Sequence, residues 1–227
     1  MISFHKVSKI YNHGSVALED IDLEIKPGEF VSLVGRSGAG KSTLIKLLIG
    51  EEKPSKGRVV FGSYEVSKLV SEQLPRFRRQ IGIVFQDFKL LPRKNAYENV
   101  AFALEVEGKP QREIEEFVPQ VLDMVGLLDK QHNFPHELSG GEKQRVAIAR
   151  AMIHRPAVMI ADEPTGNLDE KNTEEIVRLI SKINELGTTI ILATHNKHVV
   201  NLLHRRVITL ANGKVVKDEE KAKYTLE

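Results

Sequence analysis

The strongest pattern in the chain is Gly35-Arg36-Ser37-Gly38-Ala39-Gly40-Lys41-Ser42-Thr43. Apolar residues 30–34 precede it and the helix-like residues 44–48 follow it, so we predict a strand, a glycine loop and a helix. Glycines let successive backbone N–H groups point at phosphate oxygens, and the helix N-terminus adds partial positive charge. Lys41 can reach the β- and γ-phosphates, and the Ser42 hydroxyl can bind Mg²⁺. The alternative is a turn that merely links strand to helix, and the flanking elements disfavour it.

Composition excludes several classes of protein. Of 227 residues, 41% are hydrophobic and 28% charged, and the formal net charge is only +2. No overall field therefore favours nucleic acid, and we expect no nucleic-acid partner. The chain has no cysteine, which excludes disulfides and thiolate metal sites. No apolar run approaches the roughly 18 residues of a membrane span, and the N-terminus lacks the apolar core of a signal peptide.

Apolar patterns along the chain predict an α/β protein. Residues 2–7 and 18–25 alternate apolar and polar side chains, which favours two antiparallel strands, and 57–62 favours a third strand beside them. Continuous apolar runs favour buried parallel strands at 30–34, 81–85, 157–161, 188–193 and 207–210. Helices are expected at 71–79, 143–151 and 170–186. The last strand turns at Asn212-Gly213 into a hairpin.

The middle of the chain follows a different pattern. From Asn95 to about Leu128, apolar residues recur near helical spacing without a strong strand signal. We therefore expect a mostly helical subdomain, from about residue 88 to about residue 140, inserted into the α/β core. The charged end from Lys217 to Glu227 is expected to be a solvated terminus.

Two adjacent carboxylates follow the apolar run 157–161. Asp162 and Glu163 at the end of a buried strand are costly unless they are paired or bind a metal. Ligands collect at this edge of an open α/β sheet. Asp162 can hold Mg²⁺ through water, and Glu163 can polarise an attacking water. The alternative, a plain turn before Pro164, is disfavoured by the glycine loop upstream.

Other residues indicate a nucleotide site only in combination. Tyr11 could stack on a purine or could be an ordinary tyrosine. Gln86, at a strand end, is by itself a capping or solvent-facing residue. His195 follows another strand and could sense a γ-phosphate, although a lone histidine is more often structural. Ser139-Gly140-Gly141 could form a second anion site, or Ser139 could serve only as a helix N-cap.

Together, these motifs resemble the nucleotide-binding domain of ATP-binding cassette proteins over nearly the whole chain, and their agreement strengthens each weak one. The matching positions are Tyr11 (A-loop), 35–43 (Walker A), Gln86 (Q-loop), 138–142 (signature), 158–163 (Walker B and catalytic glutamate), 166–169 (D-loop) and His195 (switch histidine). Glu142 stands where the commonest signature has Gln. The resemblance implies one domain over residues 1–227. It comprises a RecA-like P-loop core, an N-terminal antiparallel β subdomain and the inserted helical subdomain.

The resemblance also implies a mechanism. ATP and Mg²⁺ would bind at the P-loop, with Ser42, Gln86 and Asp162 (through water) at the metal. Glu163 would be the general base or water orienter, and His195 would hold the γ-phosphate. The signature residues Ser139, Gly140 and Gly141 of one copy would close over the ATP of a second copy. We therefore expect a symmetric, ATP-dependent homodimer that opens when the γ-phosphate is lost.

Two stretches of sequence indicate which subgroup of ATP-binding cassette proteins the chain resembles most. Residues 162–169 are similar to the group that contains lipoprotein-release, macrolide-export and cell-division ATPases. Residues 85–93, followed by 97–100, look most like the cell-division branch, because transporter relatives tend to carry Asn at the position of Lys89. That branch implies an integral membrane partner docking between Gln86 and Asn99. It also implies a peripheral position at the cytoplasmic face of the membrane and control of cell-wall hydrolases.

Three alternatives remain at this stage. A transporter ATPase of the same group is the nearest. The apolar residues Phe88, Leu90 and Leu91 could dock the partner or equally pack within the helical subdomain. A DNA-repair type of ATPase is disfavoured, because the interval between Walker A and the signature is short, lacks cysteine and shows no sustained heptad.

Overall fold

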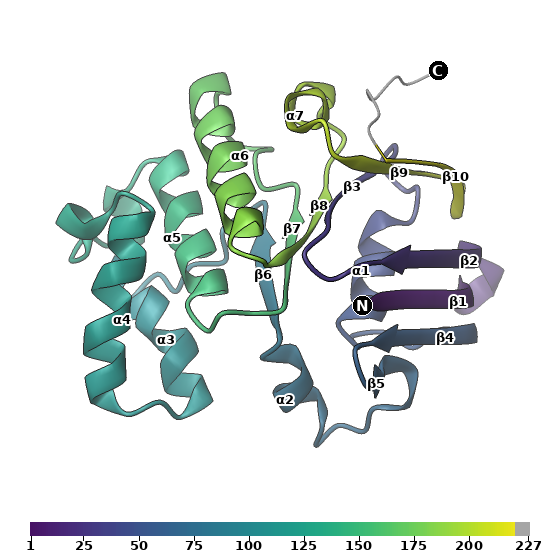
Figure 1. Cartoon of the computed structure of the whole chain (residues 1–227), viewed down its shortest axis with the longest axis horizontal. Helices are drawn as coiled ribbons and strands as arrows, with labels where there is room; N and C mark the ends of the chain where they lie inside the picture. The colour runs from purple at the N-terminus through teal and green to yellow at the C-terminus, as the bar shows by residue number, and fades with distance from the viewer. Residues whose placement is uncertain (221–227) are drawn as a thin grey trace.

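The computed structural model describes residues 1–220, and Figure 1 shows two sheets with a layer of helices on the far side of the larger one. The smaller sheet has the order β2-β1-β4-β5 and is antiparallel. Its strands are β1 (Ile2–Ile10), β2 (Val16–Ile25), β4 (Lys56–Phe61) and β5 (Tyr64–Glu65). In the register, Ile2 pairs with Ile25 and Phe4 with Leu23, so the predicted alternation places these apolar side chains inward.

The larger sheet has the order β10-β9-β3-β8-β7-β6. Its strands are β3 (Phe30–Val34), β6 (Ile81–Phe85), β7 (Val158–Asp162), β8 (Thr189–Ala193), β9 (Arg206–Ala211) and β10 (Lys214–Glu219). All neighbours are parallel except the β9–β10 hairpin. Strands covered on both faces must be apolar throughout, which explains the continuous runs in the sequence.

Helix α1 (Lys41–Leu48) lies between the two sheets and joins them into one core. Its residues Leu44, Leu47 and Leu48 are buried against both sheets. The short helix α2 (Leu74–Arg78) packs Phe77 into the same core. Because α1 is wedged in place, its N-terminus has a fixed direction toward the edge where β3 ends.

The remaining helices form a second layer and the predicted helical segment. They are α3 (Ala96–Glu107), α4 (Gln111–Met124), α5 (Gly140–Met152), α6 (Glu170–Glu185) and α7 (Lys197–Leu203). Helices α5 and α6 pack on β7 and β8, whereas α3 and α4 share a separate apolar cluster with α5. The short 3-10 turns are η1 (Asn12–Gly14), η2 (Val66–Lys68), η3 (Leu128–Lys130) and η4 (Pro135–Glu137).

Several local expectations were wrong. The helix expected at 71–79 covers only Leu74–Arg78, and helix α7 and strand β5 were not predicted, because such short elements leave little periodicity. Residues 217–219 are not a free terminus: they end β10, where the Asp218 carboxylate accepts two hydrogen bonds from Arg206 at 2.7 Å each. The rest of the predicted tail, 221–227, lies outside the described residues. Within residues 1–220, no helix is both long and apolar enough to cross a membrane.

Candidate functional site

Four adjacent strands of the large sheet end at the same edge, in the order β3, β8, β7, β6. The glycine loop follows β3, His195 follows β8, Glu163 follows β7 and Gln86 follows β6. These residues meet around one cavity of about 580 Å³. Its lining residues are Ala17, Arg36, Ser37, Gly38, Ala39, Gly40, Lys41, Ser42, Thr43, Gln86, Asp162, Glu163 and His195. The carboxyl edge of a parallel sheet is where ligands bind in such folds.

The glycine loop needs its glycines for two different reasons. Gly40 is the N-cap of α1 and has φ +108°, a conformation that disfavours side chains. A Cβ there would lie 2.8 Å from the Ala17 carbonyl oxygen, and one on Gly35 would lie 2.4 Å from the Leu210 carbonyl oxygen. The loop is therefore held tightly against β2 and β9, with the N-terminus of α1 facing the cavity.

Lys41 is the cation of this loop. Its side chain is largely buried, and Nζ donates hydrogen bonds to the carbonyl oxygens of Gly35 (2.7 Å) and Arg36 (3.3 Å). The ammonium group thus lies within the loop itself, beside the backbone N–H groups of α1. The combination of free N–H groups, helix dipole and ammonium suits a chain of phosphates.

Glu163 is held in an unusual conformation. Its φ of +48° lies in the left-handed region, which is costly for a side chain with a Cβ and is often found at functional sites. The carboxylate accepts a hydrogen bond from Thr194 Oγ1 (3.0 Å) and one from the backbone N–H of His195 (3.1 Å). His195 Nδ1 lies 2.6 Å from Glu163 Oε1. The ends of β7 and β8 therefore fix the positions of Glu163 and His195 relative to each other.

Asp162 carries a second carboxylate into the cavity. Burial and the neighbouring negative charge of Glu163 raise the pKa of Asp162, and Lys41 opposes the shift. A cation beside Asp162 would stabilise its ionised form. The oxygen atoms of Ser42, Gln86 and Asp162 suit Mg²⁺, which takes few protein ligands and completes its shell with waters and phosphates.

Gln86 has a partner that the sequence did not indicate. Its Nε2 donates to Asn167 Oδ1 (3.3 Å), and Asn167 Nδ2 donates to the Gln86 carbonyl oxygen (3.1 Å). Between them Gly166 fits closely, since a Cβ there would lie 2.7 Å from Gln86 Nε2. Asn167, predicted only as part of the D-loop, and Thr194, which carried no prediction, are thus positioning residues for Gln86 and Glu163. Their only signal was their position next to Gly166 and His195.

Not every predicted residue lies at the cavity. Tyr11 is outside its lining, and the Tyr11 ring has Lys9 Nζ 4.9 Å from its centroid. Its stacking on adenine stays a prediction. Ser139, Gly140 and Gly141 also lie elsewhere, at the N-terminus of α5, beside the start of α6.

The N-terminus of α5 is closed by a capping box. Ser139 Oγ accepts from the Glu142 backbone N–H (3.3 Å), and Glu142 Oε2 accepts from the Ser139 backbone N–H (2.8 Å). Lys130 Nζ forms an ion pair with Glu142 Oε1. The hydrogen bond from Lys130 is the main reason that the pKa of Glu142 falls to about 2. Glu142 is therefore a fixed carboxylate in the first turn of this helix.

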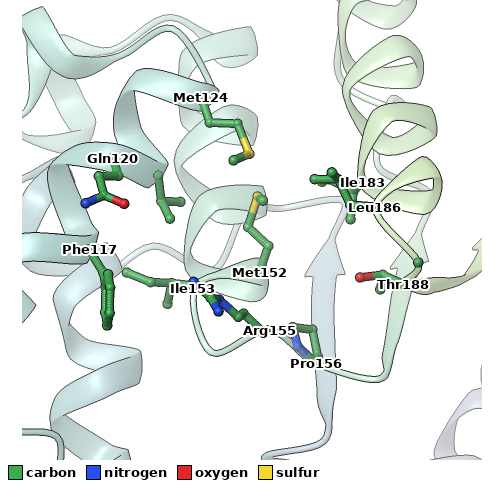
Figure 2. Close-up of a pocket in the computed structure, with 12 residues that line it drawn as sticks. Phe117, Gln120, Met124, Met152, Ile153, Arg155, Pro156, Ile183, Leu186 and Thr188 are labelled. Carbon is green, nitrogen blue, oxygen red and sulfur yellow. The ribbon is translucent and has the colours of Figure 1, made fainter. Parts of the chain in front are cut away.

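Two other hollows differ in character from the P-loop cavity. One, of about 520 Å³, lies between α4, α5 and the end of α6. Figure 2 shows Met124 and Met152 pointing toward one another on one side of it and Leu186 on the other side. No acidic residue and no glycine loop lines it. The other, of about 460 Å³, lies beside the segment that follows β6. Its lining is apolar at Leu91 and Phe102 and carries four basic side chains, Arg78, Arg79, Lys89 and Arg150, together with His154 and one carboxylate, Glu107.

The segment after β6 is held in shape by two buried or half-buried polar groups. Arg150 of α5 donates to the carbonyl oxygens of Phe88 (3.0 Å) and Lys89 (2.8 Å). The fully buried Asn99 side chain exchanges hydrogen bonds with the backbone of Leu91 (2.8 and 3.2 Å). Leu90 packs into the helical cluster, whereas Leu91 lines the basic-rimmed groove. Leu90 therefore packs within the helical subdomain, and docking of a partner on Leu91 or Phe88 stays a prediction.

Comparisons with known proteins agree with the fold and with an ATPase of the ATP-binding cassette type. A family model described as ABC transporter matches residues 18–166. The chain is 50% identical to the cell division ATP-binding protein FtsE of Streptococcus pneumoniae, over 99% of this chain and 97% of that protein. FtsE of Bacillus subtilis is 49% identical over 99% and 98%. Among solved structures, the dimeric post-hydrolysis state of the ATP-binding cassette MJ0796, bound to ADP and Pi, has a TM-score of 0.87 and 36% identity, over 99% of this chain and 100% of that one.

Proposed function

The chain belongs to the ATP-binding cassette (ABC transporter) family and is an ATPase of that family, and from this premise we propose that it powers a membrane complex of bacterial cell division. The observation that carries the ATPase assignment is the meeting of the P-loop, Glu163 and His195 around one cavity. The cell-division role rests on full-length relatives that are named for it.

In the proposed site, the phosphates of ATP lie on the P-loop. The N–H groups of α1 and the ammonium of Lys41 bind them, and Tyr11 stacks on the adenine. Ser42, Gln86 and, through water, Asp162 hold Mg²⁺. When bound, this ion neutralises charge on the phosphates. Gly35 contributes backbone conformation rather than a side chain, as do Gly38 and Gly40.

Glu163 orients the attacking water and accepts its proton. In the structure its carboxylate already accepts hydrogen bonds from Thr194 and from the backbone N–H of His195, and the His195 ring lies against Oε1, so the carboxylate is not free to contact a water. We propose that the γ-phosphate draws the exposed imidazole of His195 away from Oε1. ATP binding would then free the carboxylate only when there is a phosphate to cleave.

One chain supplies only half of each proposed site. Ser139, Gly140 and Gly141 lie outside the P-loop cavity, so they would complete the site of a second copy. A solved relative is described as a dimer in a post-hydrolysis state, which supports this arrangement for the family. We propose an ATP-dependent homodimer that opens after hydrolysis.

The basic-rimmed groove is where the membrane partner would bind. Its floor of Leu91, Phe102 and Val106 is apolar, and four basic side chains stand around it. We propose that a cytoplasmic segment of the membrane protein FtsX, apolar on one face and acidic at its edges, docks here and along Gln86 to Asn99. The chain would then lie peripherally on the cytoplasmic face of the membrane. FtsX would pass dimer closure to peptidoglycan hydrolases.

Depletion and complementation in the native host test this function. Loss of the chain should give filamentous cells with uncleaved septal wall, and the wild-type gene should restore division. Phe102→Glu should bind ATP normally but fail to co-purify with FtsX and fail to restore division, because it places a negative charge in a groove for an acidic segment. Leu186→Glu, an equally apolar exposed site at the other hollow, is the matched control and should restore division.

Two results would contradict the proposal. Normal division after depletion, with a defect in lipoprotein release or macrolide export instead, would support the transporter alternative. Restoration of division by Phe102→Glu would place the partner elsewhere.

A further inference from the structure

Glu142 creates an electrostatic problem at the signature motif. It is the third residue of α5, whose N-terminus carries Gly140 and Gly141 and is proposed to face the phosphates of a second copy's ATP. A carboxylate in the first turn stabilises its own helix by interaction with the helix dipole. The same negative charge, however, opposes the approach of a polyphosphate to that end of the helix.

The charge of Glu142 is met by a cation from outside the helix. Lys130, the last residue of η3, forms an ion pair with Glu142 Oε1, while Oε2 accepts from the Ser139 backbone N–H. The Glu142 side chain is 14% exposed and that of Lys130 is 41% exposed, so the carboxylate is turned in and the ammonium is turned out. Both carboxylate oxygens are therefore occupied by donors of the same chain.

A second capping box in this protein shows that capping alone does not require the lysine. On α3, Asn95 Oδ1 accepts from the Glu98 backbone N–H and Glu98 Oε2 accepts from the Asn95 backbone N–H, both at 2.8 Å. In the described part of the chain, no basic residue pairs with Glu98. The two boxes have the same pattern of hydrogen bonds, although the bond to the Ser139 hydroxyl is longer, at 3.3 Å. Capping by itself therefore does not account for the lysine at α5.

We infer that Lys130 is a positioning residue for ATP: by pairing with Glu142 it cancels the carboxylate's charge, so that the capped signature helix can receive the γ-phosphate of a second copy. The Lys130–Glu142 pair then takes the place of the neutral Gln found in the commonest signature. This inference rests on the in-trans site of the proposed function. It assigns to η3 a role in substrate affinity.

The test is the Michaelis constant for ATP of the full chain, alone or with its membrane partner. Lys130→Met keeps the aliphatic stem but removes the charge, and we expect KM to rise by about tenfold with kcat changed less than about threefold. Raising the salt from about 0.05 to 0.5 M should shrink the defect, because screening weakens the repulsion. Lys130→Arg should restore the KM. Lys109→Met, which breaks an ion pair with Glu113 at similar exposure on α4, is the control and should leave KM unchanged.

The decisive comparison is between the KM of Lys130→Met and that of the double variant Lys130→Met/Glu142→Gln. If Lys130 acts by cancelling the carboxylate, the second substitution should return KM to within about twofold of the wild type. A KM defect that persists in the double variant, or that does not depend on salt, would mean that Lys130 merely supports the fold and would overturn the inference. An unchanged KM in Lys130→Met, in a chain with normal thermal unfolding, would overturn it equally.

A separate measurement tests whether the proposed dimer forms. In a Glu163→Gln background, ATP should convert the chain to a dimer, measured by light scattering. A chain that stays monomeric and yet shows the Lys130 defect and its rescue would overturn the in-trans arrangement. The same result would support the charge pairing.

Discussion

The two glycine-rich helix N-termini of this protein differ in what satisfies their backbone N–H groups. At α1 the N-cap is Gly40, which has no side chain to accept from the first turn. At α5 the N-cap is Ser139, whose hydroxyl accepts from Glu142. The end of α1 is therefore left to a ligand, whereas that of α5 is already partly satisfied by its own chain. Under the proposed function, α1 would hold ATP by itself and α5 would add to a phosphate that is already held.

The largest effect should come from a substitution of Glu163, because it should nearly abolish ATP hydrolysis and leave ATP binding intact. Glu163→Gln should lower kcat by about 10²- to 10⁴-fold while ATP still binds, because the amide cannot accept the proton. The dimer should then accumulate when ATP is added. Turnover assays and light scattering measure both. Glu174→Gln, in an exposed ion pair of α6, is the control. Undiminished turnover in Glu163→Gln would remove the catalytic assignment.

Alanine at corresponding glycines of the two helices tests the comparison directly. Gly40→Ala places a Cβ 2.8 Å from the Ala17 carbonyl oxygen at φ +108°, so we expect about 100-fold weaker ATP binding by the single chain. The Cβ of Gly140→Ala would lie 3.3 Å from Leu168 Cδ2 and 3.8 Å from the Asn167 carbonyl oxygen, without a positive φ. Its binding of ATP should stay within about twofold of the wild type, while ATP-dependent dimerisation weakens. Titration with a fluorescent ATP analogue measures the first quantity. Equal losses of binding would contradict the division of roles.

Removing the cap of α5 should have a smaller effect. Ser139→Ala should lower the free energy of unfolding by about 1 kcal/mol and the Tm by about 2–4 °C, because the Glu142 N–H loses its acceptor. Asn95→Ala, at the matching box of α3, should cost similar stability. Only Ser139→Ala should also weaken dimerisation. If both variants, or neither, impair dimerisation, the α5 end is not an ATP-binding element.

The remaining effect concerns pH, and it should appear only in acid. The pKa of Glu142 is lowered to about 2 from 4.5 chiefly by Lys130, so this group stabilises the fold above its unfolded pKa. That contribution is lost as pH falls from about 4.5 to about 2. Glu142→Gln should lack this part of the acid dependence, and we expect the difference to be about 1–2 kcal/mol after allowance for solvent screening. Denaturant unfolding at several pH values measures it. Parallel pH profiles for the two chains would contradict it.

The pattern of residues predicted the strands that frame the site, and the reason is visible in the structure. Strands β3, β7 and β8 are covered on both faces, so burial left a continuous apolar run for each. The bulge after Phe4 shifts which positions of β1 face inward. The alternation of apolar and polar residues is therefore broken, and the predicted strand 2–7 lacked the last three residues of β1. Helix α7 has only seven residues, too few for a clear period.

The contacts between side chains could not be predicted in the same way. Gln86 and Asn167 are 81 residues apart, and Lys130 reaches Glu142 from a 3-10 turn that carried no motif. Thr194 looked like part of a strand end until its hydroxyl was seen on Glu163. Each contact depends on the angles at which elements pack, and sequence periodicity does not encode those angles.

The glycine loop was readable from the chain alone because its chemistry is local. Positive φ values, a preceding buried strand and a following helix all lie within residues 30–48, so neighbouring residues specify them together. The packing of the whole molecule was needed to show that the signature residues stand apart from that loop. It was also needed to show that Lys130 neutralises the carboxylate beside them. Distances between separate elements are set by tertiary packing, and the residues of one stretch alone do not determine that packing.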